Sequence, residues 1–297
     1  MKIVLSGIFY PMAILRYFEA ALRRRDDIEL FAVGPYTGAW IPWNGGMHLP
    51  VKYAAFPELP LPQNSTTAPV PIAFIEGKLP WQPDLWIQID AGFHLRGKPK
   101  HGKNVIVATD PHVLNYDRQR AFADTFYCMQ AHYSKPGDEY LPYAYDPVWH
   151  AIEDQPRTHD VCLIGLHYPQ RDALVSALRA RGLDVYYDLG PCFDEARTLY
   201  NQAPIGLNWS SLQDLVARVF ELLGMNRLAV VNDVPDLDRF FVDSADLVAF
   251  RSLDEAVERV LYYHEHTEEA QAIADQGHVT VGPYTYDARI AQILDGV

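Results

Sequence analysis

The feature that most constrains how this chain folds is the stretch from Ala203 to Asp233. It contains an apolar run, APIGLNW, then a helical pattern, SSLQDLVARVFELLGMNR, and a second apolar run, LAVVND, with almost no linker. This order predicts a βαβ unit with parallel strands, and such units bind ligands at the carboxyl ends of their strands. The residues expected at that edge are Asn208, Trp209, Ser210 and Ser211.

The helix of this unit carries two charged side chains on one face. Arg218 and Glu221 are three residues apart, a spacing that makes helical side chains neighbours. Ser210-x-x-Gln213 matches a capping box, so the anion-attracting N–H groups of the helix start are expected there. An exposed Arg–Glu pair without function, worth about 0.2–1 kcal/mol, is the alternative. The position inside the βαβ unit favours a functional role.

Both halves of the 297-residue chain alternate apolar runs with helical patterns. Residues 2–7, a helix over 12–25 and a run over 28–33 open the first half, and residues 159–166 restart the pattern after a proline-rich segment at 141–147. We therefore predict an α/β protein of two Rossmann-like domains, residues 1–146 and 147–297, with a cleft between them. Further predicted elements are a short strand at 72–76, strands at 84–90, 104–110 and 125–130, and helices at 193–202, 252–266, 268–277 and 286–294.

Composition narrows the class of protein. The apolar and charged fractions, 49% and 21%, are those of a globular protein, and the absence of any run of eighteen apolar residues predicts no membrane span. Three widely separated cysteines and a start, MKIVLSG, without a signal-peptide pattern predict a cytoplasmic protein. The formal charge of −13 falls entirely in residues 151–297, which argues against that half wrapping a polyanion.

Two apolar runs of the first half end in aspartate, at Asp90 and Asp110. Acids at the carboxyl ends of parallel strands point into the crevice where ligands lie. Asp110-Pro-His112 also places a carboxylate and an imidazole together, which suits a general base. On the residues alone, a turn-capping Asp110 with a packed loop histidine at 112 is an equal alternative.

Cofactor and metal motifs are absent from the sequence. The loop after the first strand lacks G-x-G-x-x-G, which disfavours a standard NAD or FAD site. His264 and His266 are two apart on a predicted helix, so they point in different directions and cannot share one ion. We expect neither a cofactor nor a metal site.

Several segments together resemble a known family. Asn208, Arg218-Val-Phe-Glu221, the LAVVND run, Phe250-Arg-Ser-Leu-Asp-Glu255 and Tyr284-Thr-Tyr-Asp-Ala-Arg289 resemble the C-terminal half of CgeB-like glycosyltransferases. Asp110-Pro-His112 and Leu141-Pro-Tyr-Ala-Tyr-Asp-Pro resemble that family's N-terminal segments. The resemblance covers most of the chain, and is strongest over 203–290 and loose over 34–83. It implies the GT-B fold of two Rossmann domains.

The resemblance also implies roles for residues. The second domain would hold a nucleotide-diphosphate sugar, with Arg218 at the diphosphate and Glu221 at the ribose or sugar. The first domain would bind the acceptor, and the last helix is expected to pack back on it. The expected donor-binding residues are Gly165, Arg171, Asn208, Ser210, Ser211, Arg218 and Glu221, and the expected acceptor-binding residues are Gly7, Tyr10 and Asp90.

One departure from the pattern bears on mechanism. Related retaining enzymes carry two glutamates eight positions apart, and the position eight before Glu221 is Gln213. An amide supplies no charge to an oxocarbenium-like sugar, so an inverting, metal-independent reaction with Asp110 or His112 as base is favoured.

The acceptor and the nucleotide are left open by the sequence. A polysaccharide, a lipid, a protein, a small molecule and a modified base in viral DNA, such as a hydroxymethyl-pyrimidine, are all possible acceptors. Two alternatives of another class are a non-catalytic nucleotide-sugar-binding protein on a degenerate GT-B fold and a sugar-nucleotide epimerase.

Overall fold

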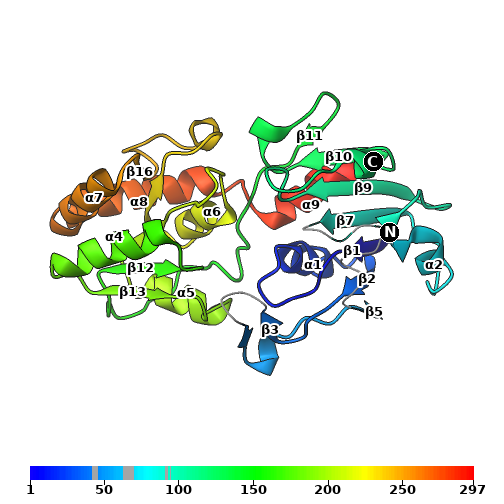
Figure 1. The fold of residues 1–297 in the computed structure, drawn as a ribbon, viewed down its shortest axis with the longest axis horizontal. Coiled ribbons are helices and arrows are strands. Elements are labelled where there is room, and N and C mark those ends of the chain that lie inside the picture. The colour runs from blue at the N-terminus through cyan, green and yellow to red at the C-terminus, as the bar shows by residue number, and fades with distance from the viewer. Residues whose placement is uncertain (42–45, 63–69, 91–92, 94) are drawn as a thin grey trace. The chain divides into compact units, whose positions relative to one another are not determined.

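A computed structural model describes residues 1–41, 46–62, 70–90, 93 and 95–297 of the chain (Figure 1). It separates into two compact units. Unit 1 consists of residues 1–142 and 286–297, and unit 2 consists of residues 143–285. The sequence placed the division after Asp146, and the structure places it after Pro142.

The described part of unit 1 is built on a seven-stranded parallel sheet of order β11-β10-β9-β7-β1-β2-β5. The chain runs from β1 to β2 and β5 on one side and then to β7 on the other, so the order reverses between β1 and β7. Such a reversal opens a crevice at the carboxyl ends of the strands. The strands are β1 Lys2–Ser6, β2 Glu29–Pro35, β5 Leu59–Leu61, β7 Leu85–Asp90, β9 Lys103–Ala108, β10 Thr125–Cys128 and β11 Glu139–Tyr140.

Short elements surround this sheet. The prediction of a strand at 72–76 is wrong, because these residues form helix α2, Ile72–Glu76. Ile72 and Ile75 are its buried residues, and that spacing of three is helical rather than alternating. The other elements are α1 Leu15–Arg23, α3 Asp117–Arg120, the 3₁₀ turns η1 Val51–Tyr53 and η3 Ala131–Tyr133, and the strand pairs β3 Trp40–Ile41 with β4 Met47–His48 and β6 Val70–Pro71 with β8 Leu95–Arg96.

The last helix, α9 Tyr286–Asp295, belongs to unit 1 and packs on α1. The ring of Tyr286 stacks on Tyr17 at 5.0 Å between centroids and meets Phe18 edge-on at 5.1 Å. The guanidinium of Arg24 binds both carboxylate oxygens of Asp287, at 3.0 and 2.7 Å. Unit 1 is therefore assembled from both ends of the described chain.

Unit 2, whose residues the structure describes throughout, contains a five-stranded parallel sheet with the strand order β13-β12-β14-β15-β16. The order reverses between β12 and β14, because the chain leaves β12 for β13 on one side and returns to β14 on the other. The strands are β12 Val161–Ile164, β13 Val185–Asp188, β14 Ile205–Asn208, β15 Leu228–Asn232 and β16 Val248–Phe250.

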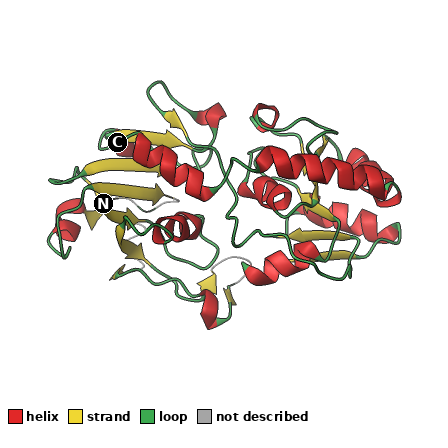
Figure 2. Ribbon diagram, turned by 180° about the vertical axis from the view of Figure 1, so that it is seen from behind, coloured by secondary structure: helices red, strands yellow, loops and turns green. Residues whose placement is uncertain are grey.

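Helices cover this second sheet on both faces, as the separate groups of helices beside the strands of unit 2 show in Figure 2. Helix α4 packs on α7, and α6 packs on α8. The middle strands β12, β14 and β15 are buried along their whole length, which is why they appear as continuous apolar runs in the sequence. The helices are α4 Pro169–Ala180, α5 Asp194–Asn201, α6 Ala217–Gly224, α7 Leu253–Glu265 and α8 Thr267–Val281, with a 3₁₀ turn η4 at Leu237–Arg239.

Candidate functional site

Three predicted donor-site residues meet at the strand reversal of unit 2. Gly165 follows β12, Asn208 ends β14, and Arg171 lies in the first turn of α4. The Arg171 guanidinium donates from Nε to the carbonyl of Trp209 at 2.9 Å, from Nη1 to that of Leu166 at 3.0 Å, and from Nη2 to Oδ1 of Asn208 at 3.2 Å. Arg171 thus ties the loop after β12 to the loop after β14.

The absence of a side chain at Gly165 leaves room for the guanidinium of Arg171. A Cβ at this position would lie 2.6 Å from Nη1 of Arg171, so a larger residue would displace the arginine. Burial lowers the pKa of Arg171, but the ordinary pKa of a guanidinium is so high that the side chain stays charged at neutral pH. The edge between β12 and β14 therefore carries a fixed positive charge, which favours an anionic ligand.

The segment between β14 and α6 is a turn closed by Ser210. Its amide donates to Oδ1 of Asn232 at 2.6 Å, its hydroxyl binds the carboxylate of Asp214, and the Asp214 amide donates back to that hydroxyl at 3.2 Å. Gln213 has a left-handed backbone with φ of 56°. The prediction that Ser210 and Gln213 cap the helix is therefore wrong: α6 begins at Ala217, after Val216. Ser211 is exposed at the tip of this turn.

Arg218 and Glu221 form an ion pair at the start of α6. Arg218 is the second residue of the helix, and its Nη1 lies 3.0 Å from Oε2 of Glu221. The Glu221 side chain is only 5% exposed and that of Arg218 21%. The guanidinium also lies over the ring of Tyr200, 5.1 Å from its centroid. This is not the exposed pair that the sequence left as an alternative, because a carboxylate so removed from water depends on its cation.

Two further polar residues at this site in unit 2 were not predicted from the sequence. His150 places Nε2 3.6 Å from Oε1 of Glu221, and Asn232, at the end of β15, holds the turn at Ser210. The Nδ2 of Asn232 is buried and has no hydrogen-bond partner among the described residues, a position that water or a ligand normally fills. Asn232 could have been predicted as the polar residue that ends the apolar run LAVVN. No local sequence pattern points to His150.

In unit 1, two predicted residues lie at the corresponding strand reversal. Gly7 follows β1, and a Cβ there would lie 2.4 Å from the carbonyl oxygen of Ile89, so the backbones of β1 and β7 approach too closely for another residue. Asp90 ends β7, but its side chain lies outside the described residues. The structure therefore assigns Gly7 a packing role and leaves the role of Asp90 a prediction.

Tyr10 and Asp110 lie close enough at the same edge to interact electrostatically. Burial, and then the charge of Asp110, raise the pKa of Tyr10 to about 12, so its phenol keeps its proton at neutral pH. Oδ2 of Asp110 accepts a hydrogen bond from the hydroxyl of Thr109 at 2.7 Å. The structure thus brings together a predicted acceptor residue and a predicted base.

His112 lines a cavity of about 360 Å³. Its ring lies 5.9 Å from that of Tyr133, between centroids. The walls are the loop after β9 and residues after β10: Pro111, His112, Val113, Leu114, Asn115, Tyr116, Arg120, Tyr133 and Lys135. A cavity at the carboxyl ends of parallel strands, lined by aromatic and polar groups, suits a small polar ligand.

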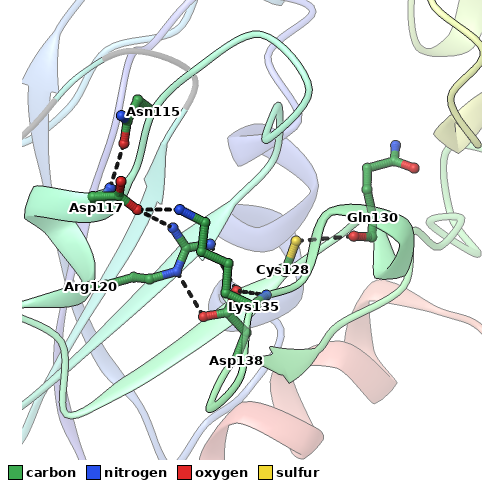
Figure 3. A network of polar contacts seen from close by, with 7 residues as sticks. All are labelled: Asn115, Asp117, Arg120, Cys128, Gln130, Lys135 and Asp138. Atoms are coloured by element: carbon green, nitrogen blue, oxygen red, sulfur yellow. Dashed lines mark hydrogen bonds and ion pairs between the residues drawn. The ribbon is translucent and has the colours of Figure 1, made fainter.

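A network of charges supports one wall of this cavity (Figure 3). Arg120 binds both oxygens of Asp138 at 2.8 Å, and Asp117 accepts from Arg120 at 3.3 Å and from Lys135 at 2.5 Å. In Figure 3 these side chains converge from α3 and from the loop after β10. The network joins the two segments that form the cavity, and its two cations and two carboxylates balance.

A larger cavity, of about 840 Å³, lies at the opposite end of the same strands. Lys2, Glu29 and Asp84 line it, at or just before the first residues of β1, β2 and β7. Ligands of parallel α/β sheets bind at the carboxyl ends, so we assign this cavity no part in the site.

Among the residues that the structure describes, no three His, Cys, Asp or Glu side chains are arranged to hold a metal ion. Within the same residues, no helix is long and apolar enough to cross a membrane.

Comparison with known proteins bears on both units. Residues 151–295, which include most of unit 2 and helix α9, match the family model described as glycosyl transferase-like. No curated protein matches the chain. Several solved structures match it over nearly its full length.

HepE of Anabaena in complex with UDP-glucose superposes with a TM-score of 0.65 at 11% identity, covering 100% of both chains. An alpha-glucosyltransferase in complex with UDP-glucose and DNA containing an abasic site gives 0.65 at 10% identity, covering 99% of this chain and 98% of its own. Sucrose-phosphate synthase of Thermosynechococcus elongatus gives 0.60 at 10% identity, covering 98% and 97%.

The fold is GT-B. The predicted fold class is thus confirmed, with two Rossmann-like units. At these identities the superpositions speak for the fold alone. The match of residues 151–295 to the glycosyl transferase-like model adds a sequence likeness to glycosyltransferases over just under half of the chain.

Proposed function

We propose that this protein is a CgeB-like glycosyltransferase that moves a sugar from a nucleotide-diphosphate sugar, of which a UDP-sugar is the first candidate, to an acceptor hydroxyl. The observation that carries the proposal is the ion pair of Arg218 with the buried Glu221 at the start of α6, in the unit that contains most of the residues matching the glycosyl transferase-like model. The UDP-glucose complexes of the structural neighbours support the choice of nucleotide.

Each charged group of unit 2 has a proposed partner on the donor. Arg218, with the N–H groups at the start of α6, takes the diphosphate, because a guanidinium fork and a helix start both favour phosphate oxygens. Glu221 accepts hydrogen bonds from the ribose hydroxyls. Arg171 and Gly165 hold the adjoining loops in place, and Asn208, Ser210 and Ser211 line the same edge.

Unit 1 is proposed to bind the acceptor and to supply the base. His112 lines a cavity, and the charge of Asp110 acts on Tyr10, which keeps its proton at neutral pH. Either group would remove the acceptor proton as the hydroxyl attacks the sugar. With Gln213 exposed in a turn instead of a glutamate at the donor, we propose inversion of configuration, with Arg218 rather than a metal ion offsetting the leaving diphosphate.

The acceptor class has two leading candidates. A saccharide suits the cavity beside His112, where the Tyr133 ring offers an apolar face among polar groups. A hydroxymethyl-pyrimidine in DNA is the second, favoured by the structural likeness to an alpha-glucosyltransferase in complex with UDP and a 13-mer DNA containing an HMU base.

A nucleotide screen tests the donor half of the proposal. Thermal melting of the full chain is measured with UDP, UDP-glucose, GDP, dTDP and CMP. At 100 times Kd, a bound nucleotide stabilises the fold by about 2.7 kcal/mol, which raises the melting temperature by about 5–10 °C. Arg218→Ala should abolish the shift, whereas Arg259→Ala, which breaks a helical ion pair on α7 of the same unit, should retain it.

Incubation with the preferred nucleotide sugar then separates the candidate activities. Transfer to an oligosaccharide or to hydroxymethyl-pyrimidine DNA, followed by mass spectrometry, identifies the acceptor. Binding without transfer to either would favour a non-catalytic protein, and conversion of the donor without any acceptor would favour an epimerase. No thermal shift with any nucleotide would contradict the donor site itself.

A further inference from the structure

A buried polar cluster joins the start of unit 2 to the candidate donor site. His150 and Asp146 come from the segment before β12, and Glu221 comes from α6. All three are almost completely buried, with exposed fractions of 6%, 0% and 4%. A histidine and a carboxylate are costly to bury, so their presence here calls for a reason beyond packing.

The hydrogen bonds of His150 define its tautomer. Its Nδ1 accepts the backbone N–H of Asp146 at 3.0 Å, so the ring proton of the neutral imidazole is on Nε2. That nitrogen faces Oε1 of Glu221 at 3.6 Å. The separation is too long for a formed hydrogen bond, but such contacts often tighten when a substrate binds.

The position of His150 is itself fixed by local structure. The Asp146 carboxylate accepts the amides of Val148 at 2.9 Å and Trp149 at 3.1 Å, which folds the chain into a turn ending at His150. Beside it, Tyr145 packs on Gly224, where a Cβ would lie only 2.5 Å from the ring. Because Glu221 and Gly224 are three residues apart on α6, the segment lies along one face of the helix.

The two carboxylate oxygens of Glu221 have different partners. Oε2 lies 3.0 Å from Nη1 of Arg218, and Oε1 lies 3.6 Å from Nε2 of His150. The two oxygens of a carboxylate turn together about one bond, so contacts at both of them fix its plane more firmly than a contact at one, and a ribose ligand needs that plane fixed. His150 supplies the second point of support.

We propose that His150 is a positioning residue, whose Nε2–H orients the Glu221 carboxylate for the ribose hydroxyls of the donor. The inference rests on the proposed function, because it assumes that Glu221 contacts the nucleotide. His150 itself makes no contact with the donor in this account and acts only through Glu221.

Two conservative substitutions separate the roles of the two ring nitrogens. In His150→Gln the side-chain amide reaches about as far as Nε2, so a donor toward Glu221 is kept. In His150→Asn the amide reaches only about as far as Nδ1, so the bond to Asp146 is kept and the donor toward Glu221 is lost. The affinity of the full chain for UDP is measured by calorimetry for each variant.

We expect His150→Gln to bind UDP within about twofold of the native protein, and His150→Asn to bind about tenfold more weakly. Equal affinity of native protein and His150→Asn would overturn the inference. Equal losses in both variants would also overturn it, because they would show a packing role alone. Melting curves of both variants accompany the titrations.

A double-variant comparison tests whether His150 acts through Glu221. We expect Glu221→Ala to weaken UDP binding about tenfold or more, and His150→Asn to add nothing to that loss. Full additivity would contradict the inference while leaving the donor site intact. If the native protein binds neither UDP nor any other nucleotide, the proposed function fails and the role of His150 fails with it.

Discussion

The two units differ in what lies at the carboxyl ends of their parallel strands, although both sheets reverse their strand order next to the candidate site residues. In unit 2 the edge is held by hydrogen-bonded side chains: Arg171 donates to the Trp209 carbonyl and to Asn208, and Asn232 accepts the amide of Ser210. In unit 1 it includes a cavity of about 360 Å³ beside His112. The edge of unit 2 is braced by hydrogen bonds and carries a fixed positive charge, whereas the edge of unit 1 includes an open cavity.

This difference agrees with the proposal that unit 2 binds the nucleotide sugar and unit 1 binds the acceptor. A nucleotide diphosphate presents the same charges in every turnover, so a pre-organised edge such as that of unit 2 loses little entropy on binding it. Acceptors vary in shape among glycosyltransferases, and a cavity formed by loops adapts more easily than one formed by strands. The predictions below test this contrast between the units.

The largest effect should come from the proposed base in unit 1. Asp110→Asn or His112→Gln, whichever group is the base, should lower the rate of transfer about 10²–10⁴-fold, because a positioned proton acceptor is lost. UDP affinity, which we propose to reside in unit 2, should not change. Steady-state kinetics and calorimetry measure the two, with Lys98→Ala, at an exposed ion pair of unit 1, as control. A parallel loss of UDP binding would contradict the separation of roles.

The rigid edge of unit 2 is tested by Arg171→Lys. The ammonium keeps the charge but cannot reach three acceptors at once, so UDP affinity should fall about tenfold and the free energy of unfolding by about 1–3 kcal/mol. Arg179→Lys on the same helix is the matched control, because Arg179 donates one hydrogen bond, to the Val185 carbonyl. Equal behaviour of the two variants would mean that the edge is not braced by Arg171.

Packing of each unit is tested by one glycine. A Cβ at Gly34 would lie 1.8 Å from the carbonyl oxygen of Gly7 in unit 1, and one at Gly277 would lie 2.0 Å from that of Asp246 in unit 2. Each Gly→Ala substitution should destabilise its own unit by about 1–3 kcal/mol. Hydrogen exchange locates the loss, and Gly77→Ala, with nothing nearer than 3.7 Å, should change little. Loss in both units from either substitution would show that they do not unfold independently.

The smallest effect should be a pH dependence confined to unit 2. Burial lowers the pKa of His150 in the folded state below its unfolded value of about 6.5, so below that pH the unfolded chain binds a proton that the folded chain does not. This share of the stability is complete above about pH 6.5 and is lost as the pH falls toward the folded pKa.

The comparison of native protein with His150→Gln isolates that share. Between pH 7 and 5 the native unfolding free energy should fall more steeply, by at most about 1.4 kcal/mol per pH unit. Chemical denaturation at several pH values measures the difference. Parallel curves for the two proteins would show that His150 takes up a proton as readily in the folded chain as in the unfolded one.

The sequence indicated the fold because the strands of a helix-covered parallel sheet are apolar along their whole length. β14 and β15 are such runs, and the polar residue that ends each of them, Asn208 or Asn232, marks the carboxyl end of the strand. An apolar run that ends in a polar residue involves neighbouring residues only, so it can be recognised in the sequence alone.

The start of α6 could not be predicted in the same way. Ser210 has the residue type and spacing of a helix cap, but its amide binds Asn232 and its hydroxyl binds Asp214. One of these partners comes from the next strand, and local pattern carries no information about it. The same reason explains why His150 was missed, since its partner Glu221 lies far along the chain.

Helix α2 shows a different limit. The five residues from Ile72 to Glu76 form barely more than one turn, and an apolar run this short fits a strand as well as a helix. Only its surroundings in unit 1 select the helix.

The return of α9 to unit 1 has a consequence for synthesis of the protein. Unit 2 is continuous in sequence, whereas unit 1 needs residues 286–297 as well as residues 1–142. Domains usually fold in the order in which they leave the ribosome. Here the order is inverted: the first unit to emerge must wait, with Tyr17 and Phe18 lacking the ring of Tyr286, until the second has been made. The nascent chain therefore exposes the surface of α1 that α9 covers until residues 286–297 have been made.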